Sequence, residues 1–482
     1  MVGTFGADGN RRIFYIYCFC EYTCLESFCT PSSDALFLSS AQCEFDTYFV
    51  SRHRVFGTTV FGNEYARDIF LDDTRDDERA HSYCTQSSIS ICMKILEINK
   101  FYYPRRGAER HFLDLIELLK QVGHEVAVFT MNNKHNVSRA YEKYFVSYVG
   151  YNKDDATLWQ RIRGIGRLFW SLEARKKIAG LTDDFQPDIV HIHNAYHQLS
   201  LSFLPIIKRQ HIPVVMTVHD YNSISPDKDA YYDTVGKQYW KFLFIQKYTL
   251  GKRLLLVLKM YWEKIWQFYA NSVDIYISPS EYCKDILVKG GIPAEKIIVI
   301  PHFVTIPDTQ PIIADANHTP YALYIGSITP EKNIAELCEI FEKLQFPFVL
   351  AGMKQMTLPE SHYVRYVGEK NKEDIQMLIQ RSQCVVSASR LPETFGLIAL
   401  EANICGKPFF GYQTGAYPEI IINGKNGWLA NDRVMLENAL SDFMTGNISC
   451  DTPDSIAHFA KEHYSPHTYV QKINALFERL QK

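Results

Sequence analysis

The chain has 482 residues, 46% of them hydrophobic, and a formal net charge of −3. This length is too great for one ordinary domain and suits two, and the apolar fraction is typical of a globular protein with large cores. The charge excludes a general attraction to nucleic acid, and the lack of any apolar run of roughly 18 residues excludes a segment that spans a membrane by itself.

Residues 1–92 do not have the pattern of a domain. Their apolar residues follow no sustained period, and residues 72–79 form a solvated charge cluster. A signal peptide is disfavoured, because the short apolar run after Arg12 is followed by Glu21 and lacks a small-residue cleavage site. We therefore expect a disordered or spurious extension, with Met93 as the natural start of the protein.

Seven of the 12 cysteines lie in this extension. They form no clean C-x2-C pairs and have no His partners, so the sequence predicts no zinc site there. The five later cysteines show neither pairing nor metal-ligand spacing, which is typical of a reducing compartment. We therefore expect a cytoplasmic protein.

From Met93 onward, apolar runs of strand length alternate with helical patterns, which predicts a parallel α/β architecture. The strands expected in the first half are 94–99, 125–130, 188–193, 213–219, 274–278 and 296–302. A turn over 104–109 and a helix over 110–122 connect the first two. Residues 305–319, rich in Pro and Asp, predict an interdomain linker. The strands expected after it are 321–326, 347–352, 363–368 and 383–388, and residues 455–482 are expected to be helical.

Two segments of the first half admit two interpretations each. Residues 157–177 are basic and aromatic, and predict either a helix with a solvated basic face, which we prefer, or a site for an anionic lipid-linked acceptor. Residues 252–269 have helical apolar spacing with Lys252, Arg253, Lys259 and Lys264 on the polar side. That pattern fits a core helix and a helix lying on an anionic bilayer surface equally well.

The segment 389–406 carries most of the chemistry. It follows the expected strand 383–388 and becomes helical from Gly396, so Glu393 is expected in a strand-to-helix turn and Glu401 on the helix. The N–H groups of Phe395, Gly396 and Leu397 would then be unpaired at the helix N-terminus, which attracts phosphate at the ligand-binding edge of the sheet. A carboxylate beside them suits hydrogen bonds from sugar hydroxyls.

The string Pro-Glu-Thr-Phe-Gly-Leu-x3-Glu-Ala over 392–402 resembles the Glu-x7-Glu motif of retaining glycosyltransferases of family 4. A bare Glu-x7-Glu is more often an ordinary buried helix, but the full string is far rarer. The resemblance covers residue 93 to about 482, including the segments 415–421 and 423–429. It implies the GT-B fold, in which two Rossmann-like domains face each other across a cleft.

The resemblance implies a donor site on the second domain. Glu401 would bind the donor ribose and Glu393 the hydroxyls of the transferred sugar. Amides near Gly396 and the Lys332 side chain would stabilise negative charge on the leaving diphosphate. Relatives place an Arg where Ser327 stands, so a bidentate guanidinium is lost and a different phosphate geometry or donor is admitted.

The resemblance also assigns residues of the first domain. Gly107 would bring the backbone close to the diphosphate, with Ala108 where many relatives have a second Gly. A His at the carboxyl end of a parallel strand faces the ligand edge. His219 would therefore hydrogen-bond the sugar, or steady positive charge through its backbone carbonyl, while Asp220 orients its ring. His193 is a weaker candidate on the acceptor side.

These residues predict a retaining glycosyltransferase that moves a sugar from a nucleotide sugar to a glycan, lipid-linked or small-molecule acceptor. The resemblance suggests cell-surface polysaccharide assembly and, because relatives often use membrane-bound acceptors, a peripheral place at the inner face of the cell membrane through 157–177 or 252–269. No metal cofactor is expected, since relatives hold the diphosphate with cations and helix N-termini and no Asp-x-Asp signature ends a strand here.

The expected domains are 93–305 for the acceptor, with the helix 466–482 packing back on it, and 306–465 for the donor. The alternative function, motivated by Ser327, is a nucleotide- or glycan-binding protein of the same fold with weak catalysis or none. A nicotinamide-dependent enzyme is excluded because neither βα turn carries G-x-G-x-x-G.

Overall fold

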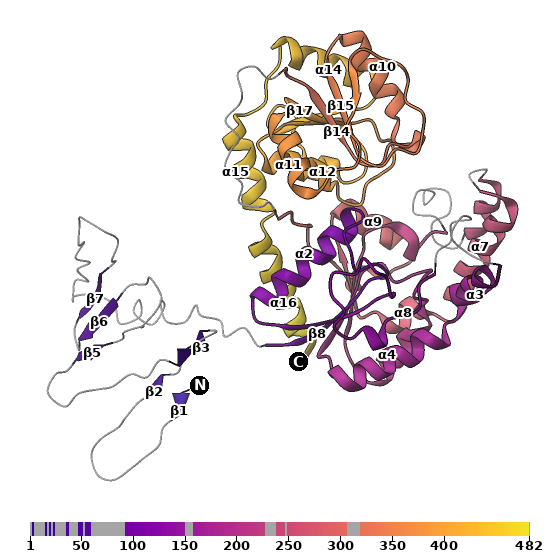
Figure 1. The fold of residues 1–482 in the computed structure, drawn as a ribbon, viewed down its shortest axis with the longest axis vertical. Coiled ribbons are helices and arrows are strands. Elements are labelled where there is room, and N and C mark those ends of the chain that lie inside the picture. Colours follow the sequence, from indigo (N-terminus) through magenta and orange to yellow (C-terminus); the bar gives the residue numbers. More distant parts are fainter. Residues whose placement is uncertain are drawn as a thin grey trace. The chain divides into compact units, whose positions relative to one another are not determined.

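The computed structural model describes residues 92–149, 158–226, 238–245, 248–305 and 319–481, the backbone alone over 158–163, and short backbone segments before residue 59 (Figure 1). The predictions for residues 1–92 and for the linker 305–319 therefore lie almost wholly outside the described residues. The early segments are antiparallel strands: β1 (Val2–Gly3), β2 (Tyr15–Ile16), β3 (Phe19–Cys20), β4 (Thr23–Cys24), β5 (Ala35–Phe37), β6 (Thr47–Ser51) and β7 (Arg54–Thr58). Residues 90–482 form a separate compact unit.

The first half of that unit is built on a six-stranded parallel sheet of order β13-β12-β11-β10-β8-β9. Its strands are β8 (Lys94–Ile98), β9 (Glu125–Phe129), β10 (Ile189–Ile192), β11 (Val214–Thr217), β12 (Ile275–Ser278) and β13 (Ile297–Val299). All four residues of β10 and of β11 are buried, as expected of strands covered on both faces. The predicted strands and their parallel arrangement are confirmed, with ends that coincide with the predicted limits or fall up to three residues inside them.

Helices flank this sheet. They are α2 (Gly107–Gln121), α3 (Leu158–Phe169), α4 (Leu172–Phe185), α5 (Leu204–Arg209), α7 (Leu250–Ile265), α8 (Phe268–Ser272) and α9 (Glu281–Lys289), with the 3-10 turns η1 (Glu142–Tyr144), η2 (Leu201–Phe203), η3 (Tyr221–Ser223), η4 (Tyr239–Phe244) and η5 (Ala294–Lys296).

Two predicted helices are each interrupted. The helix expected over 157–177 ends at Phe169, and Ser171 caps a new one by accepting a hydrogen bond from the Ala174 N–H at 3.1 Å. The helix expected over 252–269 stops after Ile265, because Gln267 adopts a left-handed backbone conformation with φ 49°.

The second half repeats the architecture with a parallel sheet of order β16-β15-β14-β17-β18-β19. Its strands are β14 (Ala322–Ile325), β15 (Phe348–Ala351), β16 (Val364–Tyr366), β17 (Cys384–Ser387), β18 (Phe409–Tyr412) and β19 (Gly427–Ala430). The turn η6 (Pro330–Lys332) and the helices α10 (Ile334–Leu344), α11 (Lys372–Arg381), α12 (Leu397–Ile404), α13 (Tyr417–Ile420), α14 (Arg433–Thr445) and α15 (Pro453–His463) complete it.

The C-terminal segment, expected to be helical over 455–482 with a last helix over 466–482, consists of two helices. Pro466 cannot continue α15, and α16 (Pro466–Gln481) starts there. In Figure 1 this helix, drawn in yellow, runs beside α2 and β8. Its apolar face, including Ile473 and Phe477, shares a buried cluster with Met93, Ile95 and Leu119 of the first half. The chain thus returns to the first sheet at its end.

Candidate active site

Glu393 lies in the loop between β17 and α12, as predicted, and glycines hold that loop. Gly396 has φ +103°, and a Cβ there would lie 2.7 Å from a ring carbon of Tyr417. Gly415 packs against the Glu393 backbone so closely that a Cβ would lie 2.4 Å from the Glu393 nitrogen, and Ala416 N–H donates to the Glu393 carbonyl at 3.1 Å. Only glycine fits both positions, so the loop fixes the start of the Glu393 side chain.

Glu393 and Lys332 form an ion pair, although 61 residues separate them. The Lys332 Nζ lies 2.5 Å from Glu393 Oε1, and the two side chains are 24% and 33% exposed. Lys332 ends the turn η6 after β14, so both groups stand at the carboxyl edge of the second sheet. The two charges neutralise each other while no other ion is bound, and an incoming phosphate would compete with Glu393 for the ammonium.

Ser327 lies in the loop between β14 and η6, at the same carboxyl edge of the sheet as Lys332. Its backbone carbonyl accepts a hydrogen bond from the Tyr324 hydroxyl at 2.9 Å. The side chain brings no charge to this edge, in agreement with the departure noted in the sequence.

Phe395 is 3% exposed and packs edge-on against His302, with ring centroids 5.4 Å apart. Its side chain belongs to the core, and only its backbone can meet a ligand. Among the described residues, no hydrogen bond uses the N–H of Phe395, Gly396 or Leu397 as donor, and no side chain caps α12. These amides are therefore free to bind an anion.

Gly107 lies opposite that helix end. A Cβ at Gly107 would lie 3.1 Å from Leu397 Cδ1, so the first residue of α2 and the first residue of α12 face each other. The N-terminus of α2 also lacks a side-chain cap, since Arg106 makes no such hydrogen bond. Two uncapped helix N-termini thus meet in one place, which concentrates partial positive charge there.

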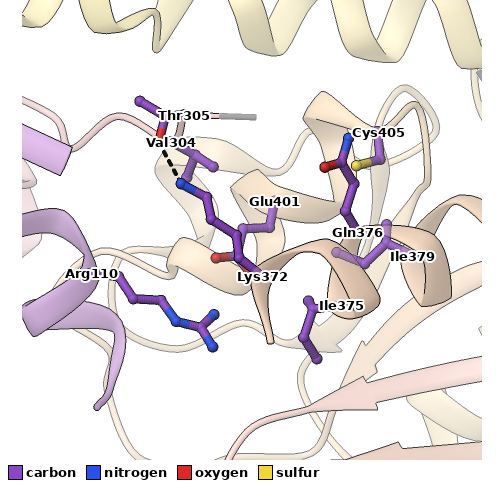
Figure 2. A pocket seen from close by; sticks show the side chains of 9 residues that line it. All are labelled: Arg110, Val304, Thr305, Lys372, Ile375, Gln376, Ile379, Glu401 and Cys405. Carbon is purple, nitrogen blue, oxygen red and sulfur yellow. Dashed lines mark hydrogen bonds between the residues drawn. The ribbon is translucent and has the colours of Figure 1, made fainter. Parts of the chain in front are cut away.

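Glu401 lines a pocket between the two halves (Figure 2). An adjoining pocket shares Arg110, Lys372 and Glu401 and reaches Gly107 and Leu397. The full linings are Arg110, Val304, Thr305, Lys372, Ile375, Gln376, Ile379, Glu401 and Cys405 for the first, and Gly107, Arg110, His111, Asp114, Phe303, Val304, Lys372, Leu397 and Glu401 for the second. Burial raises the pKa of the Glu401 carboxyl, and the charges of Arg110 and Lys372 oppose that rise.

Sequence reasoning missed Arg110, Asp114 and Lys372. The Lys372 ammonium contacts Asp114 Oδ2 at 3.0 Å and Thr305 Oγ1 at 2.6 Å, which links α11 to α2 across the pocket. A signal existed, because Arg110 and Asp114 are spaced i, i+4 on the polar face of a helix that starts at the Gly107 turn. Only the apolar face of that helix entered the prediction.

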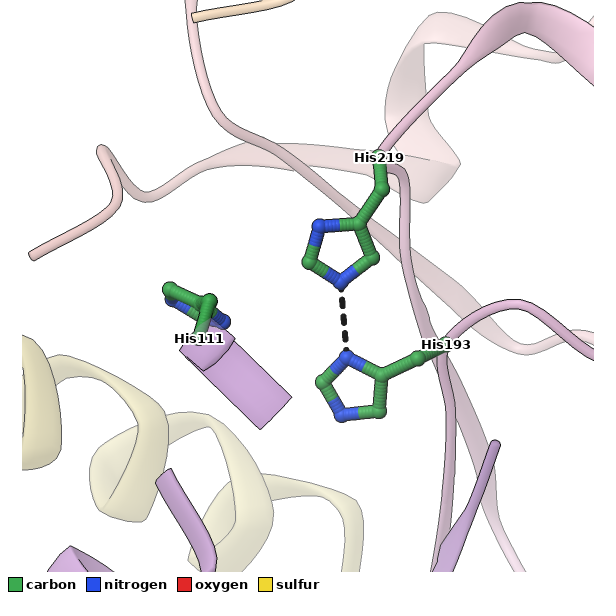
Figure 3. Close-up of side chains that lie close together, drawn as sticks. All are labelled: His111, His193 and His219. Atoms are coloured by element: carbon green, nitrogen blue, oxygen red, sulfur yellow. Dashed lines mark hydrogen bonds between the residues drawn. The ribbon is translucent and has the colours of Figure 1, made fainter. Parts of the chain in front are cut away.

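His219 follows β11 at the carboxyl edge of the first sheet, as expected. Its Nε2 lies 2.8 Å from Nδ1 of His193 (Figure 3). His193, which the sequence predicted as a weaker candidate on the acceptor side, is thus the direct hydrogen-bond partner of His219. Burial lowers the pKa of His219 to about 4, a shift that the charge of Asp220 opposes, so the ring is neutral near pH 7. The Thr394 hydroxyl donates to the His219 carbonyl at 3.1 Å, which ties the Glu-x7-Glu loop to this edge. That carbonyl retains a second lone pair.

The role predicted for Asp220 is wrong. Asp220 Oδ1 accepts hydrogen bonds from the backbone N–H and side-chain amide of Asn222, at 3.0 and 2.9 Å, and so caps the turn η3. The His219 ring is oriented by His193 instead. An acidic residue next to a His in sequence points away along an extended backbone, so adjacency was a poor guide.

Two buried histidines, His111 and His193, and the partly exposed His219 approach each other closely enough to hold a metal ion. Ring nitrogens of His111, His193 and His219 lie within 4.8 Å of one another, and burial keeps all three neutral by lowering the pKa of each. The 2.8 Å spacing of His193 and His219 is nevertheless that of a hydrogen bond with one shared proton. A second group, Glu97, His191 and His193, is likewise close, and it is joined by hydrogen bonds.

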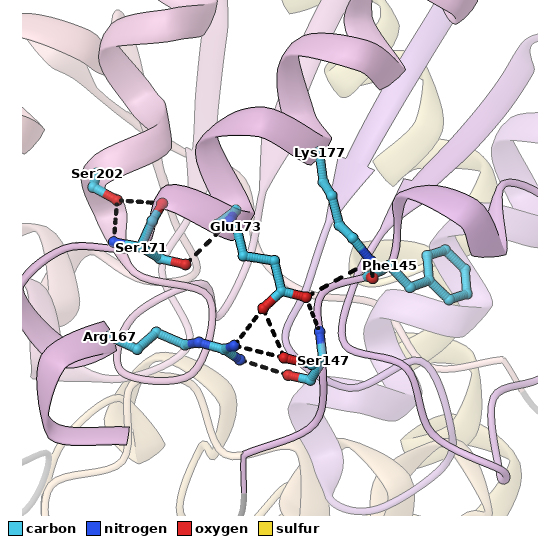
Figure 4. A network of polar contacts seen from close by, with 8 residues as sticks. Phe145, Ser147, Arg167, Ser171, Glu173, Lys177 and Ser202 are labelled. Atoms are coloured by element: carbon cyan, nitrogen blue, oxygen red, sulfur yellow. Dashed lines mark hydrogen bonds and ion pairs between the residues drawn. The ribbon is translucent and has the colours of Figure 1, made fainter. Parts of the chain in front are cut away.

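Three cations of the basic segment 157–177, Arg167, Arg175 and Lys177, are engaged by packing partners rather than lying on a solvated face (Figure 4). The Arg167 side chain is 6% exposed, with Nη2 2.6 Å from Glu173 Oε2 and a hydrogen bond to the Ser147 carbonyl. Arg175 and Lys177 donate to backbone carbonyls. The preferred interpretation is therefore wrong for these three cations, because packing partners from distant segments engage them.

The helix α7 is only partly a core helix. Lys259, predicted on its polar side, is 1% exposed and pairs with Glu263 at 2.7 Å. The exposed side instead carries large apolar residues of α7, its C-cap and the neighbouring turn η4: Trp240, Phe244, Leu250, Leu254, Leu258, Ile265 and Trp266. We call these seven residues the α7 apolar face. Among the described residues, no helix is long and apolar enough to span a bilayer.

Comparisons with known proteins agree with this geometry. The model of glycosyltransferase family 4 matches residues 105–306, and that of glycosyl transferases group 1 matches residues 307–463. An uncharacterized glycosyltransferase of Methanocaldococcus jannaschii, MJ1178, is 22% identical over 70% of this chain and 84% of its own.

Among solved structures, the sucrose-phosphate synthase of Thermosynechococcus elongatus is similar with a TM-score of 0.59, 16% identity, and coverage of 80% of this chain and 99% of that chain. The Anabaena protein Alr3699/HepE, solved in complex with UDP and glucose, gives a TM-score of 0.56 and 16% identity, over 80% of this chain and all of that chain. At such identities these likenesses support the fold alone. With its two parallel sheets and the matches of both family models, the chain is a GT-B glycosyltransferase of family 4.

Proposed function

We propose that the protein transfers a sugar from a nucleotide-sugar donor to an acceptor hydroxyl with retention of configuration at the anomeric carbon. One observation carries this proposal. Glu401 and the uncapped N-termini of α2 and α12 line one pair of adjoining pockets between the two sheets, and the loop that leads into α12 carries Glu393, paired with Lys332.

The leaving diphosphate would bind where the amides of α12 face Gly107, within reach of Lys332. There the helix ends and the ammonium stabilise the charge that develops on its oxygen. Glu401 would accept hydrogen bonds from the ribose hydroxyls, and Glu393, released from Lys332 by the phosphate, from hydroxyls of the sugar. The anomeric carbon exchanges its bond to the diphosphate oxygen for one to the acceptor oxygen, and the acceptor proton leaves with the diphosphate.

Arg110 would supply charge that Ser327 does not. It lines both pockets, and its charge acts on Glu401. Together with Lys332 and the helix N-termini, this cation can neutralise a diphosphate, so we propose that transfer needs no metal ion.

We further propose that the α7 apolar face rests on an anionic membrane, as a lipid-linked acceptor at the inner face of the cell membrane would require. Exposed Lys241, Lys252 and Lys264 lie on the same two elements as the apolar face and complement anionic headgroups. Cell-surface polysaccharide assembly remains the proposed pathway.

Vesicle sedimentation tests the membrane surface. The full chain should bind vesicles with about 30% phosphatidylglycerol more tightly than pure phosphatidylcholine, with much weaker binding at high salt. The variant Leu254→Glu/Leu258→Glu should lose binding. Val434→Glu, at an exposed apolar residue of α14, is the matched control and should keep it. Equal binding by the double variant and the control would reject this surface.

The reaction itself is tested by incubating the full chain with a panel of nucleotide sugars and following the anomeric proton of the product by NMR. Retention of the donor configuration supports the proposal, and inversion rejects it. The second candidate, a binding protein of the same fold, is motivated by Ser327. It would show nucleotide affinity without turnover or donor hydrolysis.

A further inference from the structure

The buried carboxylate of Glu97 is linked to His219 through His193 and has no part in the chemistry described above. Glu97 lies on β8, is fully buried, and pairs in register with His191 on β10. Its Oε1 lies 2.9 Å from His191 Nδ1, and its Oε2 lies 2.9 Å from His193 Nε2. Both oxygens are thus engaged by imidazoles, and His193 in turn contacts His219.

The direction of these hydrogen bonds follows from the chemistry of the groups. A carboxylate accepts only, so the proton of neutral His193 sits on Nε2, facing Glu97. The Nδ1 of His193 is then a lone pair, and the 2.8 Å contact requires His219 to donate from its Nε2. Since burial lowers the pKa of His193 and His219 alike, each ring carries one proton, and Nδ1 of His219 is left as an acceptor.

We propose that Glu97 and His193 are positioning residues that hold His219 as the Nε2–H tautomer, so that its Nδ1 accepts a hydrogen bond from a hydroxyl of the transferred sugar. This inference rests on the proposed function for its substrate, but the tautomer itself follows from the hydrogen bonds between neutral rings and a carboxylate. It predicts that the donor sugar carries a hydroxyl donor at this point, and that its deoxy or O-methyl analogue is rejected.

The surroundings of His219 favour the same state. The rings of His302 and His111 pack against it, with centroids 5.0 and 5.5 Å away. Burial lowers the pKa of both, so they are neutral neighbours. The groups whose charges act on His219 are Asp220, His191, Lys100 and Glu97. His219 therefore meets the sugar as a neutral ring with one fixed lone pair.

The tautomer can be read directly by long-range ¹⁵N–¹H NMR of the histidine-labelled full chain at pH 7.5. His193→Asn and His219→Gln assign the two rings. We expect Nε2–H for both in the wild type. In Glu97→Leu, whose side chain accepts no hydrogen bond, we expect both rings to populate both tautomers. A His219 that carries its proton on Nδ1, or a Glu97→Leu spectrum identical to the wild type, would overturn the inference.

Kinetics distinguish positioning from support of the fold. An Asn at position 193 can place its oxygen where Nδ1 stood and accept from His219, whereas a Leu cannot. With the donor that turns over, His193→Leu should lower kcat on the order of 10²-fold, and His193→Asn should recover most of it. The Kd for the nucleoside diphosphate should be unchanged in both. Equal loss in the Asn and Leu variants would contradict the inference. Absence of turnover with every donor would reject the proposed function instead, while the NMR result would still decide the tautomer.

Discussion

Removal of the Lys332 charge separates donor binding from stability. In Lys332→Gln the ion pair with Glu393 is lost. Because the two side chains are 24% and 33% exposed, water can solvate the carboxylate left behind, and the cost in unfolding free energy should be at most about 1 kcal/mol. The fold should therefore remain almost as stable as before.

The same change should weaken donor binding much more. A hydrogen bond to a charged group contributes about 1.5–3 kcal/mol, which corresponds to roughly a 10- to 150-fold rise in Kd. Part of this loss of binding free energy is offset. In the wild type the phosphate must compete with Glu393 for the Lys332 ammonium, and in the variant that competition is absent. We thus expect a rise toward the lower end of that range.

Isothermal titration of the full chain with nucleoside diphosphates, alongside urea unfolding, measures both quantities. The matched control is Lys343→Gln in the last turn of α10, whose ammonium also pairs with a carboxylate, that of Glu437, but which does not lie at the carboxyl edge of the sheet beside Glu393. The reasoning is refuted if Lys332→Gln binds the diphosphate as tightly as the control does, or if it loses several kcal/mol of stability.

Three further changes have defined outcomes. Arg110→Ala should raise the donor KM at least about 10-fold, since a charge-assisted contact with the diphosphate is lost. An unchanged KM would mean that Arg110 does not supply the positive charge that Ser327 lacks. EDTA should leave turnover unchanged, and elemental analysis should find less than about 0.1 equivalent of metal. If EDTA removes activity and a transition metal restores it, His111, His193 and His219 would instead be metal ligands. Stability should fall as the pH drops below about 6.5 toward 4, because the unfolded chain takes up protons that the desolvated His219 ring of the folded chain does not. His219→Gln should lessen that slope by up to about 1.4 kcal/mol per pH unit, and an unchanged slope in urea unfolding would contradict the burial argument.

The prediction for the N-terminal extension can be tested by deleting residues 1–92. Residues 90–482 form a compact unit by themselves, so folding and turnover should be unchanged. Circular dichroism and the glycosyl-transfer assay measure the two, and the loss of either would show that the extension is needed.

The fold was predictable because parallel strands buried on both faces are near-continuous apolar runs, and these runs mark β8, β10, β11, β14, β15 and β17 directly. The family resemblance assigned Glu393 and Lys332 to one donor site, and their ion pair agrees with that because both follow strands of one parallel sheet. Element ends were less certain, because a single cap such as Ser171 divides a helix without changing its apolar period.

Contacts between distant segments were not predictable from spacing. The pairing of Arg167 with Ser147, or of Lys372 with Asp114, depends on how loops and helices pack, and no local pattern encodes it. Glu97 could have been noticed, as a charged residue inside an apolar strand requires a buried partner. His191 and His193, which share one face of the neighbouring strand, were the candidates for that partner.

The central claim is that a nucleotide-sugar donor binds between the two sheets at Glu401 and Lys332. The most direct test is the thermal stability of the full chain with a panel of nucleotide sugars and nucleoside diphosphates, repeated on Glu401→Ala and Lys332→Ala. We predict a donor-specific rise in Tm that both substitutions abolish. The absence of any shift with any nucleotide, or a shift that survives both substitutions, would contradict the account.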